Sequence, residues 1–308
     1  MTDKPIKNIA ASVHRRLNNN AKMTGRPFQE VFQYYAMERF LYRLAQSPHA
    51  IKFVLKGALM FVVWRASTTR PTRDIDLLGR MSNSIDVILP VIRDVVDQEV
   101  EPDGLRFDAS SIEGRLIKED ADYEGVRVIF QCFLDKARVP MQIDIGFGDA
   151  VVPDPILIDY PIILDMPSPR LYGYSRETVV AEKFEAMVKL GQLNSRMKDI
   201  YDLWTLAQRF EFTGPSLCLA MKATFDRRQT LLPVAVPLAL TPEFAAVAGK
   251  QAQWQAFLNR SRLAEPGIDL LAVIQTLGQF TLPPLNSLVT GQPFDQLWLP
   301  QGPWKPAG

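Results

Sequence analysis

Two carboxylates separated by a single residue give this sequence its strongest chemical signal. Asp74 and Asp76 lie in the segment TTRPTRDIDLL, residues 68–78. In an extended strand they project to the same face, roughly 6 to 7 Å apart at Cα, while Ile75 points into the core. Two like charges side by side are unfavourable unless a cation joins them, and Mg²⁺ typically takes one or two carboxylates plus substrate phosphates. The pair therefore predicts a magnesium site, although exposed acidic pairs at strand ends are also common.

A third carboxylate belongs to a later strand candidate, residues 139–147. The alternate residues of this segment from Val139 to Phe147 are apolar and share one face, so Asp144 lies on the opposite face. We expect this strand to bring Asp144 next to Asp74 and Asp76. Two metal ions held by such carboxylates can neutralise a triphosphate and activate an attacking hydroxyl.

A lysine and a glycine stand upstream of the acidic pair. Lys56 and Gly57 follow a short apolar run, residues 51–55, and precede a segment of helix-like length, residues 58–64. A glycine between a strand and a helix lets the backbone approach a phosphate, and the helix N-terminus supplies free N–H groups. The turn therefore predicts phosphate binding, while a glycine required only by a tight turn is the alternative.

The scarcity of histidine and cysteine restricts the chemistry further. His14, His49, Cys132 and Cys218 are the only residues of these types, and no two of them are closely spaced. This excludes a zinc site of the usual nitrogen and sulfur type and disfavours a Cys/His nucleophile pair. Acid–base or metal chemistry must then use carboxylates, lysines and hydroxyls.

Four short segments resemble, in order and spacing, the motifs of AbiEii/AbiGii-type nucleotidyltransferases, the toxins of type IV toxin–antitoxin and abortive-infection systems. The first is FVLKGALM (53–60) followed by RPTRDIDL (70–77), the second is VPMQIDIG (139–146), the third is AEKFEA (181–186) and the fourth is RMKDIYDL (196–203). The resemblance covers about residues 50–210. Four motifs in sequence are far more specific than any one of them.

The resemblance implies roles for the residues of the first two motifs. Asp74 and Asp76 would bind Mg²⁺ and the triphosphate, and Asp144 would assist them or activate the acceptor hydroxyl. Thr72 sits where the family places a Ser/Thr just before the first Asp. Together with Lys56 and Gly57, Thr72 would contribute to nucleotide binding.

The later motifs imply three further site residues. Lys183 matches a family lysine that contacts phosphate. Lys183 and Asp199 would both belong to the catalytic set, and Asp202 would contribute to nucleotide binding. Lys183 is equally compatible with an exposed side chain paired to Glu182 or Glu185. Asp199 also falls in the first turn of its predicted helix, where a carboxylate favours the helix dipole.

The reaction implied by the resemblance is Mg²⁺-dependent transfer of a nucleoside monophosphate from an NTP to an acceptor, with release of pyrophosphate, of the EC 2.7.7 type. The 3′ end of tRNA would be the acceptor, and a cognate antitoxin would be encoded nearby. Ala58 departs from the family's Gly or Ser. Two alternatives therefore stay open, namely transfer to a protein or small-molecule hydroxyl and a catalytically silent nucleotide-binding protein.

The elements that must position these residues follow from hydrophobic periodicity. Apolar spacing predicts helices up to about residue 50, a helix over 82–96 with a serine N-cap, and helices over 175–191 and 197–210. Strand-like segments are 51–55, 75–78, 112–118, 126–134 and 139–147. Prolines between 153 and 169 predict an extended connection, and those after Thr281 predict an extended or loose tail.

We therefore predict an α+β protein with a helical N-terminal arm (1–50), a mixed-sheet nucleotidyltransferase core (51–170) and a helical C-terminal domain with a Pro-rich tail (171–308). Residues 1–52 carry a net charge of +6 and residues 53–170 a net charge of −7. A basic arm beside an acidic centre suits a metal site next to a surface that receives a polyanion. Basic helix faces that are simply solvated are the alternative.

Length and composition set the outer limits. The 308 residues are 47% hydrophobic and 22% charged, which excludes a chain that is disordered, collagen-like or membrane-spanning as a whole. The first ten residues, MTDKPIKNIA, contain no apolar leader segment. We expect a cytoplasmic protein that does not associate with membranes.

Overall fold

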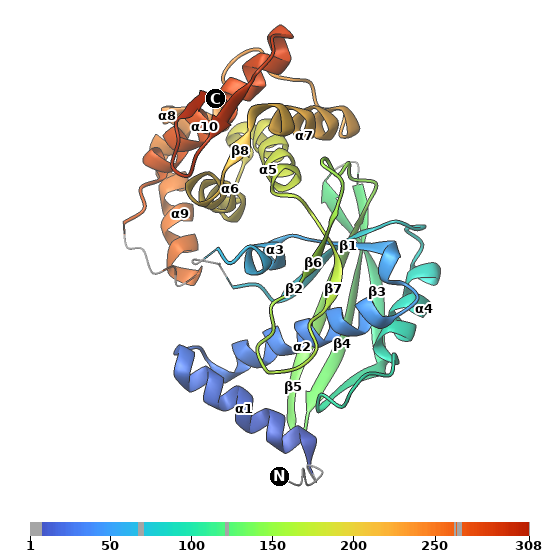
Figure 1. Ribbon diagram of the computed structural model, residues 1–308. Helices are drawn as coiled ribbons and strands as arrows, with labels where there is room; N and C mark the ends of the chain where they lie inside the picture. Colours follow the sequence, from blue (N-terminus) through green and yellow to red (C-terminus); the bar gives the residue numbers. More distant parts are fainter. Residues whose placement is uncertain (1–7, 67–70, 121–122, 262, 264–266, 308) are drawn as a thin grey trace. The chain divides into compact units, whose positions relative to one another are not determined.

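The computed structural model describes residues 8–66, 71–120, 123–261, 263 and 267–307 (Figure 1). Ile6 and residues 68–70, which belong to segments singled out in the sequence, lie outside these ranges. By contact, the chain groups into two compact units. The first contains residues 1–65, 72–148 and 156–173, and the second contains residues 66–71, 149–155 and 174–308. The finer division into an arm, a core and a C-terminal domain stays a prediction.

The first unit is built on a mixed seven-stranded sheet with the strand order β3-β4-β5-β2-β1-β7-β6. Strand β2 is parallel to β5 and β1 is parallel to β7, while the other neighbouring pairs are antiparallel. The strands are β1 (Phe53–Lys56), β2 (Asp74–Gly79), β3 (Leu105–Asp120), β4 (Tyr123–Leu134), β5 (Ala137–Phe147), β6 (Ile156–Asp159) and β7 (Arg170–Gly173). The helical elements of this unit are α1 (Ile9–Thr24), α2 (Phe28–Gln46), η1 (Ala50–Lys52), α3 (Ala58–Val63) and α4 (Ile85–Val96).

The two faces of the sheet differ in composition because side chains alternate along each strand. In β4, Val126, Val128 and Phe130 are buried, whereas Arg127 and Ile129 are partly exposed. Helix α2 packs against β5, and α4 packs against β3. These helices cover the apolar face, so the polar face of β4 and β5 carries the exposed side chains.

Helix α2 is anchored by buried charges as well as by apolar packing. Arg43 forms a bidentate ion pair with Asp103, at 2.6 and 3.2 Å, and Arg39 Nε donates to the same carboxylate at 3.3 Å. Asp103 is 2% exposed. Buried ions are tolerated when each is paired, and this cluster ties the middle of α2 to the loop before β3.

Helix α4 begins later than the sequence predicts. It starts at Ile85 with Ser84 at the N-cap, and no side-chain hydrogen bond caps it. Residues 82–84 are not helical. Helix α5 agrees with prediction, because the Ser175 hydroxyl accepts a hydrogen bond from the Thr178 backbone N–H at 3.1 Å. This serine N-cap fixes where α5 begins.

The second unit is mainly helical. Its helical elements are α5 (Arg176–Leu190), η2 (Gly191–Leu193), α6 (Met197–Arg209), α7 (Gly214–Arg227), η3 (Leu238–Leu240), α8 (Pro242–Ala246), α9 (Ala248–Ser261) and α10 (Leu270–Thr290). A small sheet of order β10-β9-β8 joins β8 (Phe212–Thr213), β9 (Gln296–Trp298) and β10 (Trp304–Pro306). The α+β class, the mixed-sheet core and the helices at both ends of the chain confirm the predicted fold.

The prediction of an extended or loose tail after Thr281 is wrong for residues 281–290, whereas the later residues form the extended strands β9 and β10. Helix α10 continues to Thr290 and contains Pro283 and Pro284. A proline leaves the carbonyl four residues earlier without its helical partner. Here the carbonyl of Phe280, four residues before Pro284, accepts a hydrogen bond from Trp304 Nε1 at 3.0 Å. Long-range packing therefore replaces a bond that local sequence rules count as lost.

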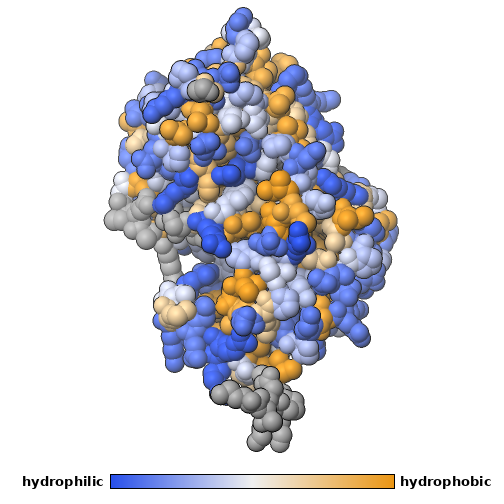
Figure 2. Space-filling view, in the orientation of Figure 1, coloured by the Kyte–Doolittle hydropathy of each residue, from blue (hydrophilic) through white to orange (hydrophobic). Residues whose placement is uncertain are grey.

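The face of the molecule drawn in Figure 2 carries mostly hydrophilic residues, with hydrophobic residues in separate groups. Exposed apolar atoms of this kind are normal for a globular surface. Among the described residues, no helix combines the length and the apolar character that a membrane span requires.

Candidate active site

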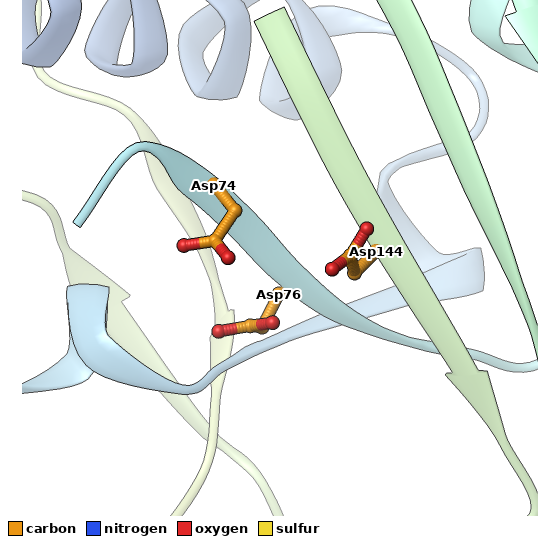
Figure 3. Close-up of side chains that lie close together, drawn as sticks. All are labelled: Asp74, Asp76 and Asp144. Atoms are coloured by element: carbon orange, nitrogen blue, oxygen red, sulfur yellow. The ribbon is translucent and has the colours of Figure 1, made fainter. Parts of the chain in front are cut away.

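Three carboxylates converge in the first unit, as the sequence predicts (Figure 3). Asp74, Asp76 and Asp144 each offer an oxygen atom, and these atoms all lie within 4.8 Å of one another. Asp74 and Asp76 are partly exposed, and Asp144 is 6% exposed. Within the described residues, this is the group of acidic, histidine or cysteine side chains with the spacing of a metal site.

Strand register places the cluster. In the parallel pair β2/β5, Asp74 lies opposite Gln142, Ile75 opposite Ile143 and Asp76 opposite Asp144. Residues in register on adjacent strands share a face of the sheet. Because Ile75 and Ile143 are fully buried on one face of the sheet, the carboxylates project from the opposite, polar face.

Lys56 and Gly57 adjoin this cluster from the other side of β2. Lys56 lies opposite Asp76 in the antiparallel pair β1/β2 and is 7% exposed. Gly57 has φ = 70°, and a Cβ atom added there would collide with the Asp76 carboxylate. Glycine is thus required twice, by its backbone conformation and by the close approach of Asp76.

Thr72 contacts the first carboxylate directly. Its hydroxyl donates to Asp74 Oδ1, and its backbone N–H donates to the Tyr34 hydroxyl at 3.1 Å. Thr72 is 7% exposed. The threonine therefore orients Asp74 and links it to helix α2.

Sequence reasoning missed Arg127, which lies opposite Asp144 in the antiparallel pair β4/β5. Its guanidinium donates to both oxygens of Asp144, from Nε at 2.7 Å and from Nη2 at 2.6 Å. Gln142 Nε2 also approaches Asp144 Oδ2 at 3.2 Å. The signal was present in the alternation of β4, since Arg127 occupies the polar face, but the strand pairing could not be inferred from one sequence.

The charges at this cluster are strongly coupled. The hydrogen bonds that Arg127 donates to Asp144, reinforced by the charges of Asp144, Asp74 and Asp76, raise the pKa of Arg127 against the opposing effect of burial. A bidentate guanidinium–carboxylate pair is among the stronger ion pairs in proteins. Arg127 thereby neutralises one of three carboxylates that would otherwise repel one another.

The predicted residues of the later motifs meet one another in the second unit. Lys183 Nζ on α5 lies 2.5 Å from Asp199 Oδ1 and 2.9 Å from Asp202 Oδ2 on α6. The two aspartates are three positions apart and share a helix face. Lys183 therefore joins α5 to α6 through the fourth-motif acids. The Lys183 side chain is 14% exposed, so Lys183 is not the exposed lysine of the alternative interpretation.

Glu185 belongs to a separate ion cluster of the second unit. Arg228 Nη1 donates to Glu185 Oε2 at 2.8 Å, and Arg228 Nη2 lies 3.4 Å from Asp149 Oδ1 and 3.7 Å from Glu182 Oε2. Burial lowers the pKa of Arg228, but the nearby carboxylates outweigh it and the net pKa is raised. This cluster anchors the end of α7 to α5.

The three-carboxylate cluster suits a hard divalent cation. Its donors are oxygen atoms only, and Mg²⁺ prefers one or two carboxylates with the remaining positions left to water and phosphate. Asp74 and Asp76 fit that description. Asp144 can join them through a lone pair that its two hydrogen bonds from Arg127 leave free.

Comparison with known proteins gives one family and two solved structures. The family model for the nucleotidyl transferase AbiEii toxin of type IV toxin–antitoxin systems matches residues 39–276. The crystal structure of JHP933 from Helicobacter pylori is 16% identical, with a TM-score of 0.49 over 85% of this chain and 94% of that chain. A second H. pylori protein, assigned provisionally as a nucleotidyltransferase, is 15% identical with a TM-score of 0.48 over 86% and 98%. No curated protein matches the chain.

Proposed function

The chain belongs to the AbiEii family of nucleotidyl transferase toxins of type IV toxin–antitoxin systems, and from this premise we propose its reaction. The protein transfers a nucleoside monophosphate from an NTP to an acceptor hydroxyl and releases pyrophosphate, with Mg²⁺ as cofactor. The acceptor we propose is RNA, at the 3′ end of tRNA, and the reaction takes place in the cytoplasm. The family implies an antitoxin partner, which we expect to be encoded nearby.

One observation carries this proposal, the convergence of Asp74, Asp76 and Asp144 within 4.8 Å on one face of the sheet. In-line attack on an α-phosphate requires positioning and charge neutralisation rather than a covalent nucleophile. When bound, Mg²⁺ would neutralise the triphosphate and lower the pKa of the attacking hydroxyl. Carboxylates held on paired strands are well suited to hold such an ion, because the register fixes their separation.

We propose that some residues around the cluster act on the triphosphate and others on the acceptor. Thr72 holds Asp74, and Gly57 leaves room for Asp76 beside the turn that follows β1. We propose that Lys56 and this turn contribute to the triphosphate side. Asp144 lies on the opposite flank of Asp76, where its carboxylate can accept the proton of an acceptor hydroxyl once Arg127 releases it.

The later-motif residues enter the proposal through the family. We propose that Lys183 contacts a phosphate and that Asp199 and Asp202 hold its ammonium group in place. Their mutual distances of 2.5 and 2.9 Å support a shared role.

The proposal is tested by incubating the purified protein with each α-labelled NTP, Mg²⁺ and total tRNA, beside an Asp74→Ala/Asp76→Ala double variant. We expect one NTP to label RNA in the wild type and no label with the double variant. The matched control is Asp86→Ala/Asp94→Ala, which removes two carboxylates from α4 and should leave labelling unchanged.

Two other results would redirect the assignment. Pyrophosphate release in cell extract without labelled RNA would indicate a protein or small-molecule acceptor. Nucleotide binding without pyrophosphate release would indicate a catalytically silent protein, the alternative that Ala58 raises. Either result would contradict the proposed transfer to RNA.

A further inference from the structure

The polar face of the sheet extends well beyond the three carboxylates. On β4 and β5 this face presents Ile129, Gln131, Phe133 and Arg138, and β3 adds Arg106 and Arg115. We call these six residues the open sheet face. All six are exposed or partly exposed, whereas the alternating positions Val128, Phe130 and Cys132 are at most 1% exposed.

Strand register makes the open sheet face continuous with the candidate active site. Arg127 opposes Asp144, Ile129 opposes Gln142, and Phe133 opposes Arg138. The same face of β5 thus carries Arg138, Gln142 and Asp144 in sequence. At about 3.3 Å per residue, the path from Arg138 to Asp144 is about 20 Å long. An extended polymer can follow such a path, and a small-molecule acceptor cannot.

The side chains along this path combine cations with an aromatic ring. Arg106 lies over the Phe133 ring with its guanidinium carbon 4.3 Å from the ring centroid. Arg106, Arg115 and Arg138 are exposed. Hydrogen bonds from Ser110, together with the charge of Arg106, lower the pKa of the neighbouring Asp108 carboxyl. Asp108 and Glu113 lie on the same face of β3, and the Asp108 carboxylate is bonded to the Ser110 hydroxyl at 2.6 Å.

This chemistry matches one class of polymer. Surfaces that bind single-stranded nucleic acid pair arginines, which follow the phosphates, with aromatic rings, on which bases stack. Arginine also stacks on bases through its planar guanidinium. Because β4 and β5 each pair with a strand on both sides, their backbones offer a peptide no free strand edge to pair with.

We propose that the open sheet face is the docking surface for the single-stranded 3′ end of a nucleic-acid acceptor, which lies along β4 and β5 and brings its terminal hydroxyl to Asp144. This inference rests on the proposed function, because nucleotidyl transfer at Asp144 decides which end of the nucleic acid points toward that residue. It assigns the acceptor path to the first unit. The six residues of the open sheet face lie outside all four family-like motifs, whereas Gln142 and Asp144 belong to the second motif.

The test measures RNA binding without nucleotide, so that it does not depend on catalysis. A short single-stranded RNA with a fluorescent 5′ label and a free 3′ hydroxyl is titrated with the full-length protein, and its anisotropy is followed over a series of salt concentrations. The open-face variant is Arg106→Glu/Arg138→Glu. The control, Arg80→Glu/Arg93→Glu, makes the same change in net charge at exposed positions away from the open sheet face. Phe133→Leu keeps apolar bulk but removes the ring.

We expect the open-face variant to bind at least tenfold more weakly and the control to stay within about twofold of the wild type. The slope of log K against log salt should fall by about 0.7 for each phosphate contact that is lost. Phe133→Leu should weaken binding about tenfold without changing that slope, because stacking is not a counter-ion effect. Thermal melting of each variant confirms that it is folded.

Equal weakening in the open-face variant and the control would overturn the proposal, as would unchanged binding in the open-face variant. A wild-type protein that binds an unstructured acidic peptide but not the RNA would also overturn it. These outcomes are separable from failure of the proposed function. Labelling of RNA that requires Asp74 and Asp76 can persist when the open sheet face proves irrelevant, and RNA can bind there when no nucleotide is transferred.

Discussion

At the scale of single residues, the site is defined by what holds each carboxylate. Asp74 is held by Thr72, Asp76 lies against Gly57, and Asp144 is held by Arg127. Each carboxylate therefore has a different neighbour, and each neighbour has a different consequence for a bound cation. The residues that touch the carboxylates can be changed separately.

The close approach of Asp76 to Gly57 leads to a prediction about the free energy of unfolding. Gly57→Ala should lower the free energy of unfolding by about 2–4 kcal/mol, because the new methyl group meets the Asp76 carboxylate and the backbone is held at positive φ. Gly25→Ala is the control for a methyl group added at positive φ, with φ = 68°, ψ = 9° and nothing within 4 Å of an added Cβ, whereas Gly57 has ψ = −151°. Urea denaturation measures both variants, and we expect about 1 kcal/mol for Gly25→Ala. Equal losses in the two variants would show that Asp76 does not press against Gly57.

The ion pair between Arg127 and Asp144 leads to a prediction about metal affinity as well as stability. Arg127→Gln removes the guanidinium from a cluster of three carboxylates, so their repulsion should lower metal-free stability while their affinity for cations rises. We expect Mn²⁺ to bind about five- to tenfold more tightly, a change of about 1 kcal/mol. Electron paramagnetic resonance of free Mn²⁺ measures the affinity, with Arg115→Gln on the neighbouring strand as the control. Weaker Mn²⁺ binding in Arg127→Gln than in the wild type would contradict this account of the ion pair.

At the scale of elements, charged residues fix how helices pack within each unit. In the second unit, Lys183 joins α5 to two aspartates of α6, and its side chain is 14% exposed. Lys183→Met should destabilise the protein by about 2–3 kcal/mol, because it removes a positive charge from beside two largely buried carboxylates. Lys198→Met, at an exposed position of α6, should change the stability by less than about 0.5 kcal/mol. The triple variant Lys183→Met/Asp199→Asn/Asp202→Asn should recover part of the loss, and a loss that stays complete would argue against the ion cluster.

Helix α2 carries a buried carboxyl that makes stability depend on pH. Burial raises the pKa of Glu38 from 4.5 to about 7, although the Ile163 backbone N–H donates to it at 2.8 Å. The folded protein therefore binds a proton that the unfolded chain releases between about pH 4.5 and about pH 7. Through this group, stability is fully present below the lower value and falls as pH rises through the higher one.

Glu38→Gln removes that dependence. Relative to the wild type, the variant should gain about 2–3 kcal/mol in the free energy of unfolding on going from acidic to neutral pH. Urea denaturation across this pH range provides the measurement. Glu30→Gln on the same helix, which breaks only a partly exposed pair with Arg26, is the control. Parallel pH profiles for wild type and Glu38→Gln would show that Glu38 is already ionised in the folded protein.

At the scale of the whole molecule, local patterns predict what depends on a single strand or helix. Period-two alternation was sufficient to put Asp144 on the polar face, and the spacing of Asp74 and Asp76 was sufficient to put both on one face. The α+β class and the helices at both ends followed from periodicity in the same way. These features depend on residues within a few positions of one another.

What could not be predicted depends on pairing between distant segments. Strand β5 inserts between β4 and β2, so Arg127 meets Asp144 across one boundary and Asp76 meets it across the other. No local pattern specifies that order. Helix α10 likewise passes through Pro283 and Pro284, and Trp304, twenty residues beyond Pro284, donates a hydrogen bond to the carbonyl that Pro284 leaves without its helical partner. From a single sequence one can predict which residues of a strand point to the core, but not which strands lie next to it in the sheet.

The central claim, that the three carboxylates form a centre for nucleotidyl transfer, is tested most directly by following the position of the label. RNA is incubated with the protein, Mg²⁺ and the same NTP labelled either at the α- or at the γ-phosphate. We predict that the α label appears on RNA, the γ label leaves with pyrophosphate, and both signals vanish in Asp76→Asn. Transfer of the γ label to RNA, or α labelling that survives Asp76→Asn, would contradict the account.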